Sequence, residues 1–242
     1  KSVEVYEKWY GIKHQMPELL EKSVYGLPEL YRDRIKDAQI VANPGCYPTC
    51  SILGIAPLLK NNIIETSNII IDAASGVTGA GRSTDLPYQF CECTENYKAY
   101  KVSNHRHTSE IEQELSFLAN EDILVSFTPH LVPMKRGMLA TIYGNLKKDT
   151  STSELINLYK EFYKNEYFIR VLDEGKLPET KFTAGSNFID ISIVVDKRLN
   201  RVVVLSCLDN LGKGASAQAV QDLNIMCGYD EKTGLESPGL CL

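Results

Sequence analysis

The sequence lacks the features that mark membrane, secreted and nucleic-acid-binding proteins. Its 242 residues contain no uninterrupted apolar run of about 18 residues, so no membrane-spanning helix is expected. The first residues, Lys1 to Tyr6, are too polar for a secretory signal. Acidic residues outnumber lysine and arginine by 31 to 26, and no basic stretch is interleaved with aromatic residues. A nucleic-acid-binding role therefore has no support, because it requires a basic face.

A disulfide framework is also absent from the pattern of cysteines. The seven cysteines form an odd, scattered set, at positions 46, 50, 91, 93, 207, 227 and 241. Such usage is typical of a reducing compartment, and we expect a cytoplasmic protein. The hydrophobic share of 43% and the charged share of 24% are those of an ordinary soluble globular protein. The length permits one large domain or two small ones.

The hydrophobic patterns predict an α+β fold with a mixed or antiparallel sheet. Short apolar or alternating runs predict strands at residues 40–42, 69–71, 124–128 and 138–143, and a hairpin that pairs 189–195 with 202–205. Apolar residues at helical spacing predict helices that begin near Cys46, Ser109, Ser151 and Gly214. Ser109 with Glu112, and Ser151 with Glu154, match the spacing of a capping box.

Two further helix features follow from single residues. Pro57 lies inside the first helical pattern and is expected to kink that helix or end it early. In the last helix, Ala219, Leu223 and Met226 repeat on one face, which predicts that this face is buried. Gly228 is a plausible C-cap of the same helix.

Cys46 is a candidate nucleophile because of its position. It follows a predicted strand and the turn Asn43-Pro44-Gly45, and it precedes a predicted helix. A free thiol has a pKa of about 8.5, and the N–H groups of a helix start lower that value and favour the reactive thiolate. The same N–H groups can bind an oxyanion. The alternative is a small buried hydrophobe, which most free cysteines are. Cys50 falls one helical turn further on, and we interpret it as packing.

The segment His105-Arg106-His107 supplies the ionisable groups that such a thiol requires. Two of the four histidines lie here, just before a predicted helix. An imidazole can move the proton of a thiol, and the arginine can face an acidic substrate. Zinc binding by His-x-His together with Cys91-Glu92-Cys93 is a competing idea, but the spacing matches none of the usual structural zinc patterns, and we predict no metal. A histidine that caps the helix is the structural alternative.

Two glycine-rich segments carry weaker signals. Residues 75–82 have glycines at 76, 79 and 81, which does not match the G-x-G-x-x-G spacing of dinucleotide-binding turns. Residues 211–214 form a second short glycine loop before the last helix, a possible seat for an anion or a cofactor. Taken alone, each segment fits a plain loop better than a binding site.

Taken together, these segments resemble the N-acetyl-γ-glutamyl-phosphate reductase family, which is related to aspartate-semialdehyde dehydrogenase. The similarity extends over nearly the whole chain, in the family's order. The residues that carry it are 25–30, 42–49, 75–82, 105–111, 127–134 and 209–215.

The resemblance implies a mechanism and a set of roles. A thiolate attacks an acyl phosphate, and hydride from NADPH reduces the resulting thioester to an aldehyde. The likeness makes Cys46 the nucleophile and His105 the acid–base residue. It also places His107 and Glu110 at the substrate, and it places Ser75, Gly76 and Asn210 at the nicotinamide end of the cofactor. Arg106 is a further candidate for the phosphate, by its charge and position.

The chain departs from the family pattern at its start. The family begins with a glycine-rich phosphate-binding turn on a Rossmann-like unit, and no such turn is found here. We therefore expect three parts: residues 1–45 as a remnant of the dinucleotide-binding domain, 46–207 as the catalytic and dimerisation domain, and 208–242 as a helix that returns to the first. These 242 residues are expected to bind NADPH weakly, which calorimetry would test. The family further implies a homodimer or homotetramer, with the 188–205 hairpin in the interface.

Three alternatives remain open. The first is a sister reductase that acts on aspartyl or aminoadipyl phosphate. The second is an acyltransferase or hydrolase that uses the same cysteine and histidine without a cofactor. The third is a non-catalytic protein that serves in assembly through an exposed sheet face.

Overall fold

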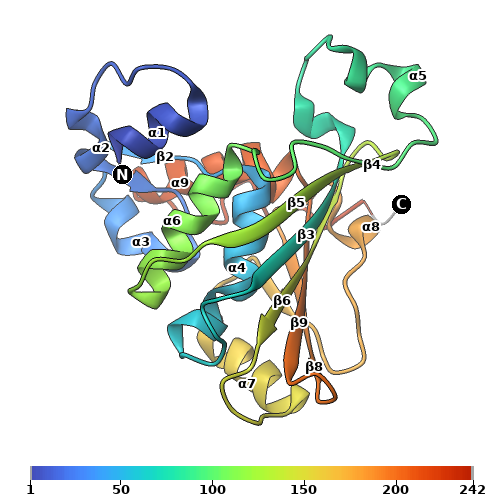
Figure 1. Cartoon of the computed structure of the whole chain (residues 1–242). Coiled ribbons are helices and arrows are strands. Elements are labelled where there is room, and N and C mark those ends of the chain that lie inside the picture. The colour runs from blue at the N-terminus through green and yellow to red at the C-terminus, as the bar shows by residue number, and fades with distance from the viewer. Residues whose placement is uncertain (1, 241–242) are drawn as a thin grey trace.

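The computed structural model describes residues 2–240 and has the α+β fold that was predicted (Figure 1). The strands are β1 (Ser23–Tyr25), β2 (Ile40–Ala42), β3 (Ile69–Gly76), β4 (Lys98–Ala99), β5 (Val125–Val132), β6 (Met138–Asn145), β7 (Ile169–Val171), β8 (Ile189–Asp196) and β9 (Arg201–Leu208). The longer helices are α1 (Val3–Tyr10), α3 (Pro28–Lys36), α4 (Cys46–Lys60), α6 (His107–Ala119), α7 (Thr152–Phe162) and α9 (Ala217–Met226). The short helices and turns are α2 (Glu18–Lys22), η1 (Val77–Ala80), η2 (Leu86–Tyr88), α5 (Phe90–Cys93), α8 (Thr180–Thr183) and η3 (Gly212–Ser216).

Seven strands form one mixed sheet in the order β4-β5-β3-β6-β9-β8-β7. β3 pairs in parallel with β5 on one side and antiparallel with β6 on the other. β8 and β9 pair antiparallel from Ile189 opposite Leu208 to Asp196 opposite Arg201, which confirms the predicted hairpin. β1 and β2 form a separate parallel pair.

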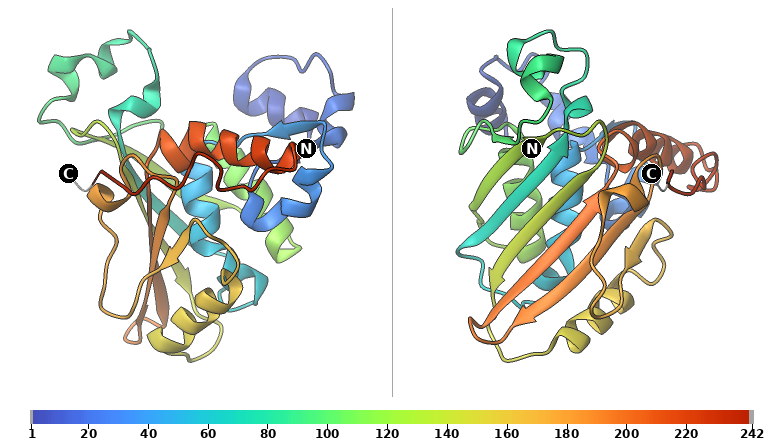
Figure 2. Two further views of the ribbon diagram at one scale, coloured as in Figure 1. Left: turned by 180° about the vertical axis from the view of Figure 1, so that it is seen from behind. Right: turned by 90° about the vertical axis from the view of Figure 1, so that its right-hand side faces the viewer.

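The two faces of the large sheet differ in what covers them. Along β6 the residues alternate strictly between buried and half-buried positions, and Met138, Ala140 and Ile142 face the helices. α4, α6 and α7 lie on that face, whereas strands β3, β6 and β9 are open on the other face (Figure 2). The open face carries half-exposed apolar side chains, among them Leu139 and Val203. In the described structure, the open face of the sheet therefore exposes apolar side chains in part.

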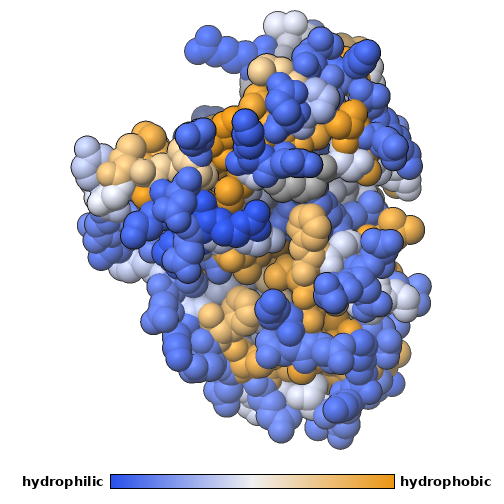
Figure 3. Space-filling view, turned by 90° about the vertical axis from the view of Figure 1, so that its left-hand side faces the viewer, coloured by the Kyte–Doolittle hydropathy of each residue, from blue (hydrophilic) through white to orange (hydrophobic). Residues whose placement is uncertain are grey.

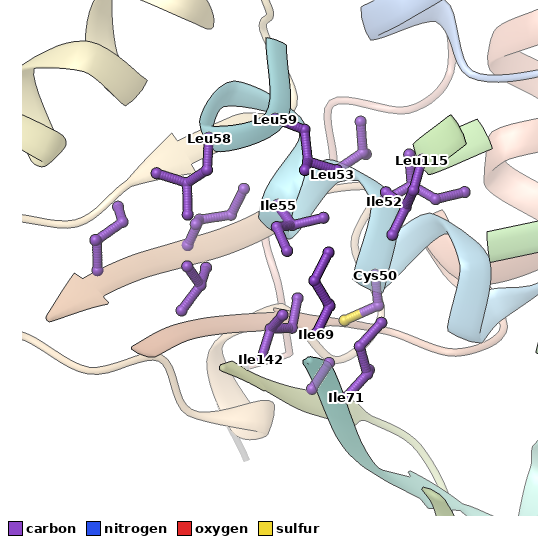
Figure 4. Packing of buried hydrophobic residues seen from close by; sticks show 14 of the residues in the cluster. Cys50, Ile52, Leu53, Ile55, Leu58, Leu59, Ile69, Ile71, Leu115 and Ile142 are labelled. Atoms are coloured by element: carbon purple, nitrogen blue, oxygen red, sulfur yellow. The ribbon is translucent and has the colours of Figure 1, made fainter. Parts of the chain in front are cut away.

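Helix α4 is the centre of the core and is buried on all sides from Tyr47 to Leu59. Its side chains interdigitate with those of the strands beneath it, and the Cys50 side chain points at the sheet (Figure 4). The Cys50 thiol donates a hydrogen bond to the carbonyl of Ser206 at 3.1 Å, which confirms its packing role.

The expectation that Pro57 kinks or ends this helix was wrong. α4 continues to Lys60 with no break in its helical backbone. Pro57 has no N–H to donate to the carbonyl of Leu53, and the hydroxyl of Tyr163 donates to that carbonyl instead, at 2.6 Å. The missing backbone bond is thus replaced by a side chain from beyond α7.

One of the two predicted capping boxes is present. Ser151 and Glu154 exchange both hydrogen bonds at the start of α7. The prediction for Ser109 and Glu112 was wrong, because α6 begins two residues earlier, at His107. The Ser109 hydroxyl donates back to the Arg106 carbonyl, and Glu112 accepts the backbone N–H of Val125.

The predicted buried face of the last helix was also wrong. α9 exposes Ala219 and Leu223 and buries polar residues, including Gln221 and Asp222. These pack against a fully buried ion pair between Lys213 and Glu29, which Gln221 joins by hydrogen bonds. The hydrogen bonds of these buried polar groups, and not the apolar periodicity, therefore determine which face of α9 is buried. Gly228 follows the helix end with φ 73°, the left-handed conformation expected of a terminating glycine.

The exterior of the molecule is mixed in character. On the side that carries α1 to α3, apolar side chains appear as patches separated by hydrophilic ones (Figure 3). Within residues 2–240, no helix is both long and apolar enough to span a bilayer.

Candidate active site

Cys46 is the first residue of α4, as the sequence predicted. Gly45 caps the helix in an extended conformation, so the chain turns directly from the 43–45 loop into the first helical turn. Two glycines allow close approach here. A side chain on Gly214 would lie 2.8 Å from Cβ of Cys46, and one on Gly45 would lie 2.4 Å from Nε2 of His107. The turn η3, the start of α4 and His107 therefore lie close together around the thiol.

A pocket of about 220 Å³ opens above Cys46 at the end of the sheet toward which β3 and β5 run. It brings together most of the predicted site, including Ser75, Gly76, His105, Arg106 and His107. The other lining residues are Tyr47, Gly79, Ala80, Ser83, Asp85, Tyr88, Tyr100, Lys101 and Leu131. Several of these belong to residues 77–104, which form the arm at the top right of Figure 1.

His105 is held on both of its ring nitrogens. Its Nδ1 accepts the backbone N–H of His107 at 3.2 Å, and its Nε2 lies 3.4 Å from the hydroxyl of Tyr100. The ring also packs edge-on against Tyr47 and Phe127. The side chain is 7% exposed, so its orientation is fixed by the protein rather than by solvent.

The imidazole of His107 lies against the start of α4, with its Nε2 over Gly45. Its Nδ1 is buried and has no hydrogen-bond partner in the described part of the chain. One nitrogen of this ring therefore faces the helix start, and the other is not engaged by those residues.

Arg106 and Glu110 occupy different places around this centre. Arg106 is exposed at the rim of the pocket, and its positive charge acts to lower the pKa of Cys46. Glu110 lies behind the helix start, where it accepts the N–H of Gly45 at 3.3 Å and the hydroxyl of Tyr25 at 2.9 Å. It lines a neighbouring hollow of about 280 Å³ instead of the pocket above Cys46.

The residues predicted at the nicotinamide end fall into two groups. Ser75 and Gly76 line the pocket directly. Asn210 is buried behind it, where its carbonyl oxygen accepts the N–H of Gly137 at 2.8 Å and its amide donates to the Thr78 hydroxyl at 3.0 Å. Asn210 thus ties the 77–80 turn to the start of β6.

Burial dominates the protonation state of the site. It raises the pKa of the Cys46 thiol to about 12, although the backbone N–H groups of Tyr47 and Cys46 act in the opposite direction. The net direction is thus opposite to the lowering that the helix start alone predicts. The helix start has the predicted effect, but desolvation is larger. Burial also lowers the pKa of His105 to about 4 and that of His107 to about 3, so both rings are neutral at pH 7.

Sequence reasoning missed several residues of this pocket, and three of them contact His105 or add charge. Tyr47 and Tyr100 connect to His105, and Lys101 adds a second cation to the lining. Tyr47 is part of the motif that contains Cys46, so its proximity was available from the sequence. Tyr100 and Lys101 lie in an irregular segment with no periodic pattern, and no sequence signal indicated them.

No group of three or more histidine, cysteine, aspartate or glutamate side chains is arranged to hold a metal ion among residues 2–240. The six cysteines in that range are all free thiols.

Comparison with solved structures identifies the class of the fold. The chain superimposes on aspartate semialdehyde dehydrogenase II from Vibrio cholerae with a TM-score of 0.70 at 15% identity, over 93% of this chain and 77% of that one. The complex of that enzyme with ASA gives a TM-score of 0.69 at 15% identity, over 86% and 69% of the two chains. The family described as semialdehyde dehydrogenase, dimerisation domain, matches residues 46–210. The chain is therefore a semialdehyde dehydrogenase-type oxidoreductase.

Sequence relatives narrow this class. An N-acetyl-γ-glutamyl-phosphate reductase from Acetivibrio thermocellus is 76% identical over 242 residues, which is all of this chain and 70% of the relative. The protein of that name from Caldicellulosiruptor bescii is 57% identical over 235 residues, 97% of this chain and 68% of the relative. The chain belongs to the N-acetyl-γ-glutamyl-phosphate reductase family, and its family domain supports assembly into oligomers.

Proposed function

We propose that this protein reduces N-acetyl-γ-glutamyl phosphate to the semialdehyde, a step of arginine biosynthesis, through a thioester on Cys46. The observation that carries the proposal is the pocket itself. A half-buried thiol at a helix start shares one space with two neutral imidazoles and the Arg106 guanidinium. That set of groups suits attack on an acyl phosphate, and the names of the relatives supply the acyl group.

The first step requires the thiol to lose its proton. Because the pKa of Cys46 is raised to about 12, the thiolate forms only when a base removes the proton. His107 is suited to this, since it is neutral and its Nε2 lies over the residue before Cys46. The sulfur then bonds to the acyl carbon as the carbon–oxygen bond to phosphate breaks. Arg106 and Lys101 stabilise the departing dianion.

The Ser75-Gly76 segment and Gly79 have the geometry of a cofactor wall. A side chain on Gly79 would make ordinary contacts with the Asn210 amide at 3.4 Å and the Ser75 hydroxyl at 3.5 Å, so Gly79 lies directly beside these two groups. We assign the nicotinamide end of NADP(H) to this wall. When bound, the cofactor supplies the hydride that reduces the acyl carbon.

The remaining steps are proton movements by residues of this chain. After reduction, the carbon bears a negatively charged oxygen, which a hydrogen bond from His105 stabilises. This oxygen forms the carbonyl double bond as the carbon–sulfur bond breaks, the aldehyde leaves, and the proton held by His107 passes to the released thiolate. Cys46 is restored for the next cycle.

The proposal extends to the whole molecule. We assign residues 46–207 to catalysis and dimerisation, and 1–45 and 208–242 to the side that holds the dinucleotide. The parallel pair β1–β2 supports this assignment, because parallel strands normally belong to larger α/β sheets. We further propose a homodimer or homotetramer that packs through the open sheet face and the 188–205 hairpin, in the cytoplasm.

The experiment is an assay of phosphate-dependent NADP⁺ reduction with three semialdehydes, those of N-acetylglutamate, aspartate and aminoadipate. We expect turnover with the first and its loss in Cys46→Ser, with Cys50→Ser as the matched control on the same helix. A preference for another semialdehyde would contradict the proposed substrate and identify a different one. If the main activity were hydrolysis of thioesters without a cofactor, the protein would be a hydrolase and not the proposed reductase.

A further inference from the structure

Four groups form a continuous hydrogen-bonded chain from the sheet to the start of α6. The Tyr47 hydroxyl donates to the backbone carbonyl of His130 on β5 at 3.1 Å. The Tyr100 hydroxyl donates to the Tyr47 oxygen at 3.2 Å. The Tyr100 oxygen lies 3.4 Å from Nε2 of His105. This series of hydrogen bonds therefore ends on the imidazole of His105.

The bond between Tyr47 and the His130 carbonyl determines which group donates and which accepts along this series of hydrogen bonds. A backbone carbonyl can only accept a hydrogen bond, so the single proton of Tyr47 is committed to His130. The single proton of Tyr100 is then committed to Tyr47. The Tyr100 oxygen has only acceptor capacity left toward His105. An attractive contact at that point requires a proton on Nε2.

The opposite side of the ring imposes the same tautomer. The backbone N–H of His107 can only donate, and it points at Nδ1 of His105 at 3.2 Å. Nδ1 must therefore keep its lone pair. A backbone carbonyl at one end and a backbone N–H at the other both select the neutral ring with its proton on Nε2.

Packing holds these hydrogen-bonded side chains in place. Tyr47 is 2% exposed, and its ring meets His105 edge-on at 5.4 Å between centroids. Tyr100 meets the same ring at 5.5 Å. Turning the imidazole by half a turn would replace both ring nitrogens with carbons and lose both contacts.

We propose that Tyr47 and Tyr100 are positioning residues that hold His105 in its Nε2–H tautomer. His105 then presents a proton, not a lone pair, to the pocket, and it acts as donor to the substrate oxygen while His107 accepts the proton of Cys46. The 3.4 Å contact to Tyr100 is long, so the N–H is free to shift toward an oxygen bound beside it. This division of roles rests on the proposed function, whereas the tautomer does not.

The test is nitrogen NMR on protein labelled with ¹⁵N-histidine, which reports protonated and unprotonated ring nitrogens directly. The chain has only four histidines, and a His105→Gln variant assigns the signal. We expect the Nε2–H form of His105 at pH 7 in the unsubstituted protein. Tyr47→Phe frees the Tyr100 proton to turn toward Nε2, and Tyr100→Phe removes the acceptor. Each is expected to shift the tautomer ratio about fivefold toward Nδ1–H, which corresponds to about 1 kcal/mol.

The control is Tyr159→Phe, which removes another buried hydroxyl, bonded to the Gly54 carbonyl and unconnected to His105. It should leave the His105 signals unchanged. An Nδ1–H form in the unsubstituted protein overturns the proposal, and so does an unchanged ratio in both tyrosine variants. The spectra require no substrate, so this result stands apart from the proposed reaction, which fails instead if Cys46 forms no acyl intermediate.

Discussion

Cys46 experiences two opposed effects, and their balance defines how the site works. The N–H groups at the start of α4 favour the thiolate, and burial beneath the pocket disfavours it more strongly. The neighbouring imidazoles are neutral for the same reason, since burial disfavours their charged forms as well. The resting site is therefore an uncharged thiol beside uncharged bases. In the proposed reaction, the thiolate of Cys46 therefore forms during attack on the substrate, not before it.

Alkylation of Cys46 should reflect this resting state. Because its pKa is raised to about 12, the thiolate fraction at pH 7 is very small and rises about tenfold per pH unit well past pH 9. We expect iodoacetamide to modify Cys46 slowly at pH 7, with a rate that still increases between pH 9 and pH 10. Peptide mapping by mass spectrometry separates Cys46 from the exposed Cys91 and Cys227. A rate that levels off below pH 8 would show that the thiolate is already present at rest.

The sequence predicted which residues meet in the pocket better than it predicted their protonation states. Cys46 and the 105–107 segment were indicated by residue type next to predicted helix starts, and the structure brings them into one pocket. The raised pKa of the thiol was not predictable, because burial of a helix start depends on segments far along the chain, such as the turn η3 that carries Gly214. Glu110 and Asn210 were placed near the site, but their hydrogen bonds show that they support its walls.

At the scale of elements, α4 shows how a local rule is overridden. A proline near the end of a helix removes one backbone hydrogen bond, and here the Tyr163 hydroxyl fills the vacated acceptor on Leu53. A pattern confined to residues 46–60 cannot reveal a tyrosine more than a hundred positions away. The α9 prediction failed for a related reason, since its polar face packs on the ion pair between Lys213 and Glu29, and Glu29 lies near the other end of the chain.

Removal of the Tyr163 hydroxyl should show how much Pro57 lowers the stability of the protein when its missing hydrogen bond is not replaced. Tyr163→Phe leaves the buried Leu53 carbonyl without a donor, and we expect a loss of about 1–3 kcal/mol in the free energy of unfolding. In a Pro57→Ala background the helix regains its own N–H, so the same substitution should cost clearly less. Urea denaturation of the four proteins measures this coupling.

Tyr159→Phe is the matched control for that cycle. Its partner Gly54 keeps its helical partner, the N–H of Leu58, so the loss should be smaller than for Tyr163→Phe. Equal losses for Tyr163→Phe with and without Pro57 would contradict this account of the proline.

At the scale of the molecule, the open side of the seven-stranded sheet is the most conspicuous unpaired surface of the described chain. β3, β6 and β9 alternate strictly enough that one face is core and the other presents half-exposed apolar residues such as Leu139, Val203 and Leu205. A sheet face of this kind buries its apolar residues when a second copy packs on it. The match of residues 46–210 to a dimerisation domain fits this reading.

A charge placed on this face should separate the subunits. We expect Leu139→Asp to lower the sedimenting mass to that of one chain at micromolar concentration, because the carboxylate would have to be desolvated in the interface. Leu124→Asp, at a leucine that is 78% exposed just before β5, is the control and should leave assembly unchanged. Unaltered association of Leu139→Asp in analytical ultracentrifugation would exclude the sheet face as the contact surface.

The most direct test of the central claim is whether Cys46 carries the acyl group. The protein is mixed with N-acetyl-γ-glutamyl phosphate in the absence of cofactor, and phosphate release is followed together with the intact mass. We predict release of one phosphate per chain, a mass gain of one N-acetylglutamyl group on the peptide that contains Cys46, and neither in Cys46→Ser. Phosphate release that persists in Cys46→Ser, or an acyl group on a different residue, would contradict the account.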